Sequence, residues 1–223
     1  MKKYFSRQDL ARISEAIEKA EKKTSGEIAV AFVKQSDTYA IYELLFALIL
    51  GVVFFNILLF FYTPIEHFIQ THTWHYSTQM TTAVIGLSSF IFIALLYLLF
   101  NIPFLDRLIV PKKVMKKKVS DRAFLHFIQA GITETRDRSG ILIFISHLER
   151  RVMIIADKGI NQKIEQGQWA EFIDEIVLGI KKGHLTDHLV QVIRKCGYLL
   201  EEHFPIKDDD TNELSNEMTI LER

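Results

Sequence analysis

Cysteine is nearly absent from this sequence of 223 residues, because Cys196 is its one thiol. A single cysteine excludes an intrachain disulfide and a thiolate-rich metal site, and such sparing use is typical of compartments where thiols stay reduced. An excess of charge of either sign is also lacking, since 27 basic residues balance 27 acidic ones. This balance gives no indication of a nucleic-acid partner, and we expect none.

Two long stretches of the chain lack charge altogether, one from Leu44 to Tyr62 and one from about Met80 to Phe100. Roughly 20 apolar residues in a helix cross a hydrocarbon core of about 30 Å, so each stretch is long enough to span a bilayer. Helices buried in a soluble core would show a polar stripe or end sooner, and a cleavable signal peptide would lie nearer the N-terminus. The sequence therefore predicts an integral membrane protein with a helical hairpin at residues 41–107.

The distribution of Lys and Arg predicts the orientation of this hairpin. The connecting segment 63–79 carries neither residue, whereas Arg107 and the lysines at positions Lys112, Lys113, Lys116, Lys117 and Lys118 follow the second stretch. Because positive residues are retained on the cytoplasmic side, we expect both termini in the cytoplasm and the hairpin in the plasma (inner) membrane. The lysines begin a helix, where they oppose its dipole, so we predict that they bind anionic lipid headgroups rather than stabilise the helix. The alternative is a solvated charged face.

About 140 residues remain outside the hairpin, enough for one soluble domain. In residues 1–40, Ser6 caps a helix, and the segment Glu27 to Lys34 is apolar on both faces, which is typical of a central strand. In residues 108–206, Pro111 begins a helix with an apolar face, and two β-branched segments at 141–146 and 151–156 form an antiparallel hairpin. That apolar face comprises Val119, Ala123, Phe127, Ile128 and Ile132. Two amphipathic helices follow, and we expect the polar residues 207–223 to form a mobile tail.

Several short motifs in this order resemble the TPM domain family. They are Thr24-Ser25-Gly26-Glu27-Ile28, Gly140 to Ser146, Glu149-Arg150-Arg151-Val152 and Ala156-Asp157-Lys158-Gly159-Ile160, and Trp169 and Phe204-Pro205 also fit the pattern. The resemblance spans about Leu10 to Pro205 without the hairpin. It implies an α/β fold, a mixed-sheet α/β sandwich, here interrupted by a two-helix transmembrane hairpin. The family includes plant thylakoid proteins of photosystem repair, nematode receptor-associated proteins and bacterial membrane proteins; it carries a phosphatase label, and some members bind calcium through acidic loop residues.

The calcium loop of that family is poorly matched here. Where many relatives have a loop rich in Asp and Asn, this sequence reads Arg136-Asp137-Arg138-Ser139-Gly140. Asp137 is the one candidate metal ligand, and we expect the flanking guanidinium groups to repel a cation and to occupy the carboxylate. The sequence therefore predicts no metal and no cofactor. The pair His184 and His188 is interpreted as surface histidines near a helix cap rather than as a zinc site.

Candidate functional side chains gather around the predicted strand hairpin. Glu149, Arg150 and Arg151 lie in its turn and could bind a phosphate or a partner, and Asp157 ends its second strand, so we expect the four to line one edge of the sheet. Glu27 could join Asp157 as a catalytic carboxylate in a cleft. The alternatives are a charged hairpin tip with solvated ion pairs and a satisfied charge at a strand end.

Two functions remain open from the sequence. One is a membrane-anchored cytoplasmic TPM-like module that binds partners, lipid or membrane protein, at the inner membrane surface. The other is a phosphatase or phosphoesterase acting near the membrane, which rests on the family resemblance alone because the sequence contains no phosphate-binding glycine loop and no nucleophile elbow.

Overall fold

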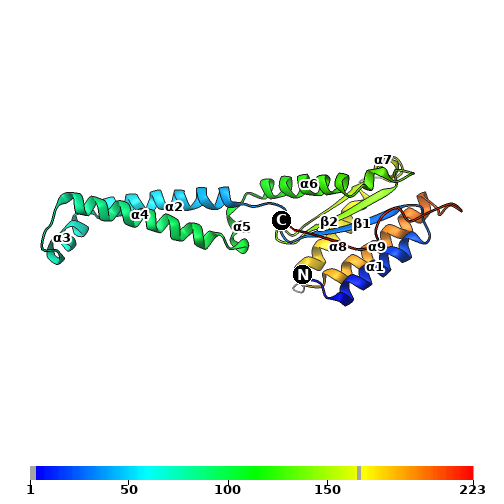
Figure 1. Ribbon diagram of the computed structural model, residues 1–223, viewed down its shortest axis with the longest axis horizontal. Coiled ribbons are helices and arrows are strands. Elements are labelled where there is room, and N and C mark those ends of the chain that lie inside the picture. Colours follow the sequence, from blue (N-terminus) through cyan, green and yellow to red (C-terminus); the bar gives the residue numbers. More distant parts are fainter. Residues whose placement is uncertain (1–3, 165–166, 223) are drawn as a thin grey trace. The chain divides into compact units, whose positions relative to one another are not determined.

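The computed structural model describes residues 4–164 and 167–222, and it divides into two compact units. One unit combines Met1–Thr38 with Lys113–Arg223, and the other is Tyr39–Lys112. The first unit is thus built from two pieces of chain that the second unit separates. Figure 1 shows the elements of both units.

A four-stranded mixed sheet lies at the centre of the first unit, with strand order β3-β2-β1-β4. β1 (Glu27–Val33) pairs in parallel with β2 (Gly140–Ser146), and β2 pairs antiparallel with β3 (Arg151–Ala156). The expected mixed sheet, the central position of β1 and the β2–β3 hairpin are confirmed. Every residue of β2 is buried, as is typical of a strand covered on both faces.

Helices cover both faces of this sheet (Figure 1). α1 (Arg7–Glu21), α8 (Gln168–Lys182) and α9 (Leu185–His203) contribute to one apolar cluster with Val30, Phe32 and Ile143. α6 (Lys112–Gln129) forms a second cluster with Ala31, Val33 and Phe144 on the opposite face. Because successive strand residues point to opposite faces, the uninterrupted apolar pattern of β1 and β2 supplies both clusters. The smaller helices α7 (Lys158–Asn161) and η1 (Ile132–Glu134) connect these layers.

Local sequence signals position several helix ends as expected. Ser6 and Asp9 form a capping box at the start of α1, and Gly183 adopts a φ of 77° after α8. α6 ends earlier than the sequence indicated, at Gln129, because Gly131 turns the chain with a φ of 69°. Of the predicted apolar face, Val119, Ala123 and Phe127 are buried on α6, Ile128 is 54% exposed, and Ile132 is buried beyond the helix, in η1.

The C-terminal segment departs from expectation. Residues 219–221 form β4 (Thr219–Leu221), which pairs in parallel with β1 at Ala31 to Val33. Met218 is buried in the first apolar cluster, and Leu214 packs against the second. The prediction of a mobile tail was wrong for this segment, because three residues add to an existing strand without any apolar periodicity of their own.

The second unit is a helical hairpin. α2 (Ala40–Phe60) and α4 (Thr78–Phe100) match the two predicted apolar stretches, and both are long and apolar enough to cross a membrane by length and composition. They run antiparallel, with Phe54 stacked on Phe92 at 4.2 Å and Phe46 against Phe100 at 5.3 Å. Two helices that the sequence did not indicate, α3 (Tyr62–His72) and α5 (Pro103–Ile109), lie between and after them.

The docking of β4 yields a stability prediction. Met218→Ala removes a buried side chain and should lower the free energy of unfolding by about 2 kcal/mol. The matched control is Thr219→Ala, which alters the exposed side chain that follows Met218 and begins β4, and which should change the free energy of unfolding by less than about 0.5 kcal/mol. Thermal unfolding of the full chain in detergent, followed by near-ultraviolet circular dichroism, measures both. Equal midpoints for the two variants would show that β4 adds no stability.

Candidate functional site

Three candidate carboxylates lie at one end of the sheet. Glu27 opens β1 and is in register with Gly140, the first residue of β2. Asp157 follows β3, and its backbone N–H donates to the Gly140 carbonyl at 2.9 Å. Since neighbouring strands are spaced about 4.8 Å apart, Glu27 and Asp157 lie roughly 10 Å apart with Gly140 between them. Asp137 lies in the loop that enters β2.

Asp157 is held by the backbone around it. One carboxylate oxygen accepts from the Lys158 N–H at 2.6 Å and caps α7, and the other lies 3.7 Å from the Arg138 guanidinium. Gly159 brings the two loops together, because a Cβ there would lie 2.6 Å from the Asp137 carbonyl and 2.7 Å from that of Arg138. Asp157 therefore has a structural role: it caps α7 and links the start of that helix to the loop that carries Arg138.

Asp137 forms an ion pair with Lys207 at 2.6 Å. The expectation that its flanking arginines occupy it was wrong. Arg136 reaches the carboxylate of Asp209 at 3.0 and 3.3 Å, and Arg138 turns to Asp157. The C-terminal segment supplies Lys207 and Asp209, which the sequence could not show because 70 or more residues separate each from its partner. Within residues 4–164 and 167–222, no group of three or more His, Cys, Asp or Glu side chains is arranged to hold a metal ion.

Two carboxyl groups, those of buried Glu27 and half-buried Glu21, lie beside this segment. Glu27 accepts from the Glu213 backbone N–H at 3.0 Å, and Glu21 accepts from the Ile28 N–H at 2.9 Å. Desolvation raises the pKa of Glu21 to about 8, against the hydrogen bond from Ile28 and with the help of the neighbouring Glu27 and Asp210 charges. Desolvation likewise raises the pKa of Glu27. Burial thus disfavours the charged form of both carboxyl groups, and composition alone gave no sign of Glu21.

The hairpin turn lies at the opposite end of the sheet. Glu149 accepts from the Ser36 backbone N–H at 3.0 Å and from the Ser146 hydroxyl, and Arg151 is in register with Ser146. The six residues of β3 separate Arg151 from Asp157 by about 20 Å. Glu149, Arg150 and Arg151 thus lie at one end of the edge strand β3 and Asp157 at the other, so the four residues share one edge of the sheet without converging on a common site.

The predicted lipid-binding lysines lie on the first half of α6. Met115 and Val119 turn inward there, whereas Lys112, Lys113, Lys116 and Lys117 are exposed. Lys118 differs, because it pairs with Asp37 at 2.5 Å. Among the histidines, His188 bonds to Glu175 at 2.8 Å, and His184 precedes α9.

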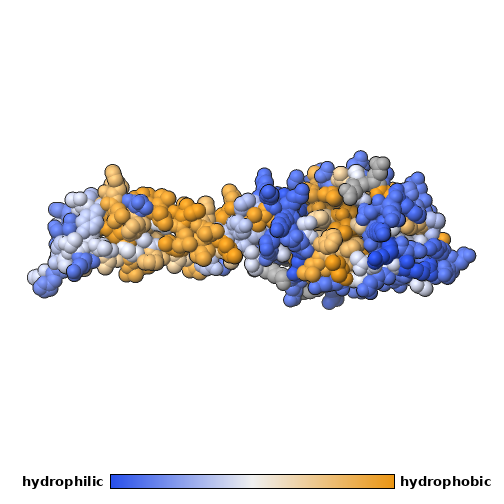
Figure 2. Space-filling model, turned by 90° about the horizontal axis from the view of Figure 1, so that it is seen from above, coloured by the Kyte–Doolittle hydropathy of each residue, from blue (hydrophilic) through white to orange (hydrophobic). Residues whose placement is uncertain are grey.

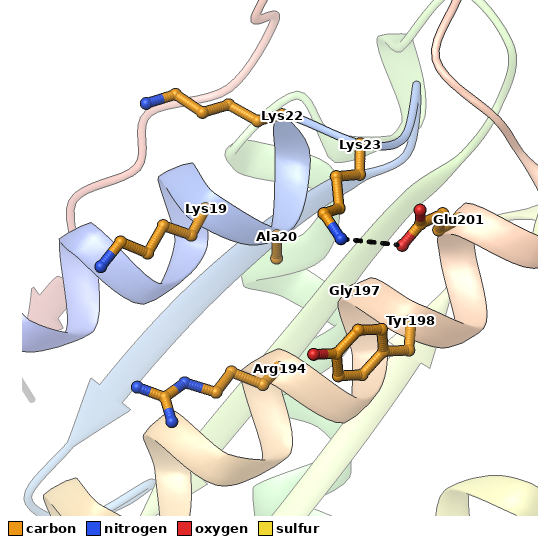
Figure 3. Close-up of a pocket in the computed structure, with 8 residues that line it drawn as sticks. All are labelled: Lys19, Ala20, Lys22, Lys23, Arg194, Gly197, Tyr198 and Glu201. Atoms are coloured by element: carbon orange, nitrogen blue, oxygen red, sulfur yellow. Dashed lines mark ion pairs between the residues drawn. The ribbon is translucent and has the colours of Figure 1, made fainter.

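A shallow basic pocket of about 470 Å³ between α1 and α9 was not foreseen (Figure 3). Gly197 allows α9 to approach Ala20 of α1, and Lys19, Lys22, Lys23 and Arg194 surround the contact. Figure 3 shows Lys19, Lys22 and Arg194 extending to the left, whereas Lys23 turns toward Glu201, with which it pairs at 3.7 Å. Lys19 and Lys22 pair with glutamates of their own helix. Exposed pairs of this kind contribute little, and the pocket has no convergent geometry for a ligand.

Comparison with known proteins identifies the fold. Residues 108–197 match the family model of the TPM domain, so this part of the chain is a TPM domain. The NMR structure of the BA42 protein from the psychrophilic bacterium Bizionia argentinensis superposes with a TM-score of 0.58 at 22% sequence identity, covering 99% of this chain and 98% of that chain. At this identity the likeness concerns the fold. No curated protein shows significant sequence similarity to the chain. The resemblance drawn from short motifs is thus confirmed for the TPM domain.

The buried carboxyl groups predict a pH dependence of stability. A carboxyl group whose pKa rises from 4.5 in the unfolded chain to about 8 in the folded protein, as for Glu21, takes up a proton on folding between these two pH values. Its contribution to the free energy of unfolding is fully present below pH 4.5 and is lost as the pH rises to about 8. Glu21→Gln keeps the neutral form at every pH. Compared with the parent, this variant should unfold at a higher temperature at pH 8, and the difference should disappear near pH 4.5.

Melting temperatures of the full chain and of Glu21→Gln, measured from pH 4.5 to pH 8.5, test this expectation. Glu15→Gln is the control, because the Glu15 side chain is 60% exposed on the same helix. If the melting temperatures of the parent and of Glu21→Gln changed with pH in the same way, the raised pKa of Glu21 would be contradicted.

Proposed function

We propose that this protein is a membrane-anchored binding module, in which α2 and α4 cross the plasma membrane and the unit with the TPM domain works at its cytoplasmic face. The observation that carries the proposal is the exposure of apolar side chains along both helices. In each, 17% of the most apolar window is buried. Ile49 is 60% exposed, Phe60 84% and Phe90 74%. Transfer of each such side chain from water into hydrocarbon is favourable by about 1.5–3 kcal/mol. The helices are therefore more stable in a bilayer than in water.

The contact between α2 and α4 supports the same conclusion. A Cβ at Gly51 would lie 2.2 Å from Ile93, so the missing side chain allows the two helices to approach closely. Small residues at helix contacts are typical of membrane bundles, where dispersion replaces the hydrophobic effect as the driving force. The hairpin therefore has an internal contact and an apolar exterior suited to lipid.

A binding role accounts for the carboxylates better than the phosphoesterase alternative. Asp157 caps α7, and Glu27 accepts a backbone hydrogen bond from the C-terminal segment, so both serve the fold. Cys196 is fully buried, and burial raises the pKa of its thiol to about 12, which disfavours the nucleophilic thiolate. Hydrolysis of a phosphomonoester by the purified chain, abolished by Asp157→Ala in a folded variant, would favour the phosphoesterase instead.

The orientation can be tested by labelling. In a Cys196→Ser background, Thr71→Cys places a thiol between the two spans and Asp208→Cys places one in the C-terminal segment; both positions are exposed. An impermeant thiol reagent applied to intact cells should label the first variant alone, because the segment between the spans carries no Lys or Arg. Both should react after lysis. Labelling of Asp208→Cys in intact cells would contradict cytoplasmic termini.

The lysines at the start of α6 predict selective binding of anionic lipid. At about 1 kcal/mol each, replacing Lys113, Lys116 and Lys117 by Gln should weaken binding of phosphatidylglycerol up to about 100-fold and leave phosphatidylcholine unaffected. Native mass spectrometry of the full chain in detergent measures both lipids. The matched control replaces Lys181, Lys182 and Lys195, three exposed lysines of α8 and α9. If both triple variants lost the same affinity for phosphatidylglycerol, binding would depend on net charge and not on the lysines of α6.

A further inference from the structure

The edge of β3 is open in the part of the chain that the structure describes. In an antiparallel pair, alternate residues of a strand direct their backbone N–H and C=O groups toward the neighbouring strand. The hydrogen bond from the Asp157 N–H to the Gly140 carbonyl shows which residues of β3 do so. Residues 151, 153 and 155 therefore face β2, whereas Val152, Ile154 and Ala156 direct their backbone N–H and C=O groups away from it. One of these outward groups, the Ala156 carbonyl, accepts from the Asn161 side chain at 2.6 Å. The others lie along a strand that has no further strand neighbour in the sheet order.

Native edge strands commonly carry charges, prolines or bulges that prevent pairing with another chain. β3 has none of these between Val152 and Ala156, where it reads Val-Met-Ile-Ile-Ala. An apolar edge of this kind is suited to pairing with another strand.

A cleft of about 790 Å³ runs along this edge, within the first unit. β3 lines it from Met153 to Ala156, α6 forms one wall with Phe124 and Ile128, and α8 forms the other with Trp169 and Ile173. Phe124 and Ile128 are 58% and 54% exposed, and the Trp169 Nε1 has no hydrogen-bond partner within the described residues. Figure 2, which views the unit from above, shows hydrophobic surface over α6 beside hydrophilic surface. An additional strand would lie about 4.8 Å beyond β3, between the two walls.

The charges at the two ends of the strand limit what can occupy the cleft. Arg150 and Arg151 lie at its beginning, and Lys158 lies just beyond its end. The nearby carboxylates are engaged, since Asp157 caps α7 and Glu149 accepts hydrogen bonds from Ser36 and Ser146. A complementary occupant therefore has an apolar middle with acidic residues on both sides.

We propose that this cleft binds an extended segment of a partner protein, which adds to the sheet as a strand beside β3. Its backbone pairs with Val152, with Ile154 and with the outward N–H of Ala156, its alternate apolar side chains contact α6 on one face and α8 on the other, and its acidic flanks meet Arg151 and Lys158. A second copy of this domain fits less well, because its own α6 and α8 would enter the space between the walls. The inference deepens the proposed binding function by naming the class of partner.

The test uses the full chain in nanodiscs, with Trp74→Phe so that Trp169 is its one tryptophan. Random peptides of about ten residues, enough to extend past the strand at both ends, are selected by phage display against this protein. Selected peptides are synthesised and titrated while Trp169 fluorescence is followed. We expect sequences with alternating apolar residues between Asp or Glu flanks.

Three variants locate the binding. Phe124→Glu with Ile128→Glu places charge in the cleft wall, and Ala156→Pro removes an outward N–H; each should weaken binding by about tenfold or more. Leu125→Glu is the matched control, because Leu125 is 47% exposed on the same helix and does not line the cleft, and its affinity should be unchanged. Circular dichroism confirms the fold of each variant.

The proposal is overturned if the selection yields no binder, or if the binders lose affinity equally in Phe124→Glu with Ile128→Glu and in Leu125→Glu. Basic flanks in the selected peptides would also contradict it. Lipid binding by α6 and thiol labelling are measured separately from peptide binding. A negative peptide result therefore does not contradict the membrane-anchored module, and a negative labelling result does not contradict peptide binding in the cleft.

Discussion

The parallel pairing of β1 with β2 is the contact on which the rest of the first unit depends. It runs from Glu27 against Gly140 to Val33 against Ser146, between segments more than a hundred residues apart. Closing so long a loop costs conformational entropy, although the cost grows slowly with length. Complete burial of β2 offsets that cost, and the register positions everything else: β3 extends the sheet on one side, β4 extends it on the other, and helices cover both faces. Without this pair, the sheet that the two pieces of the domain share would divide into β2 with β3 and β1 with β4.

The same pairing explains the chemistry at the sheet end. Because β1 and β2 begin side by side, Glu27 is drawn into a buried position next to the loop that carries Asp137. The C-terminal segment then lies across this end, with Lys207 on Asp137 and the Glu213 backbone on Glu27. The acidic cluster is therefore a consequence of chain closure, and its raised pKa values follow from burial. These carboxylates bind parts of the chain itself, which favours a structural role over a catalytic one.

The two proposed binding features lie on one helix. The first half of α6 presents lysines suited to anionic lipid, and its second half presents Phe124 and Ile128 to the cleft beside β3. Its buried face packs on the sheet through Val119, Ala123 and Phe127. A membrane surface and an extended partner segment would thus both contact the helix that follows the proposed anchor in the chain.

Elements whose signals are local could be predicted from the sequence. Uncharged stretches predicted α2 and α4, capping residues positioned α1, and the apolar pattern of residues 27–34 and 141–156 predicted the central strand and the hairpin, whereas the TPM-like fold was implied by the resemblance of short motifs to that family. Features that depend on residues distant in the chain follow from the folded structure alone. Residues 219–221 form β4 because the edge of β1 was unpaired, and Asp137 forms an ion pair with the distant Lys207. Asp157 is separated from Arg151 by the length of β3. Local patterns report the periodicity of a segment, whereas pairing partners are set by which surfaces remain open once the core has formed.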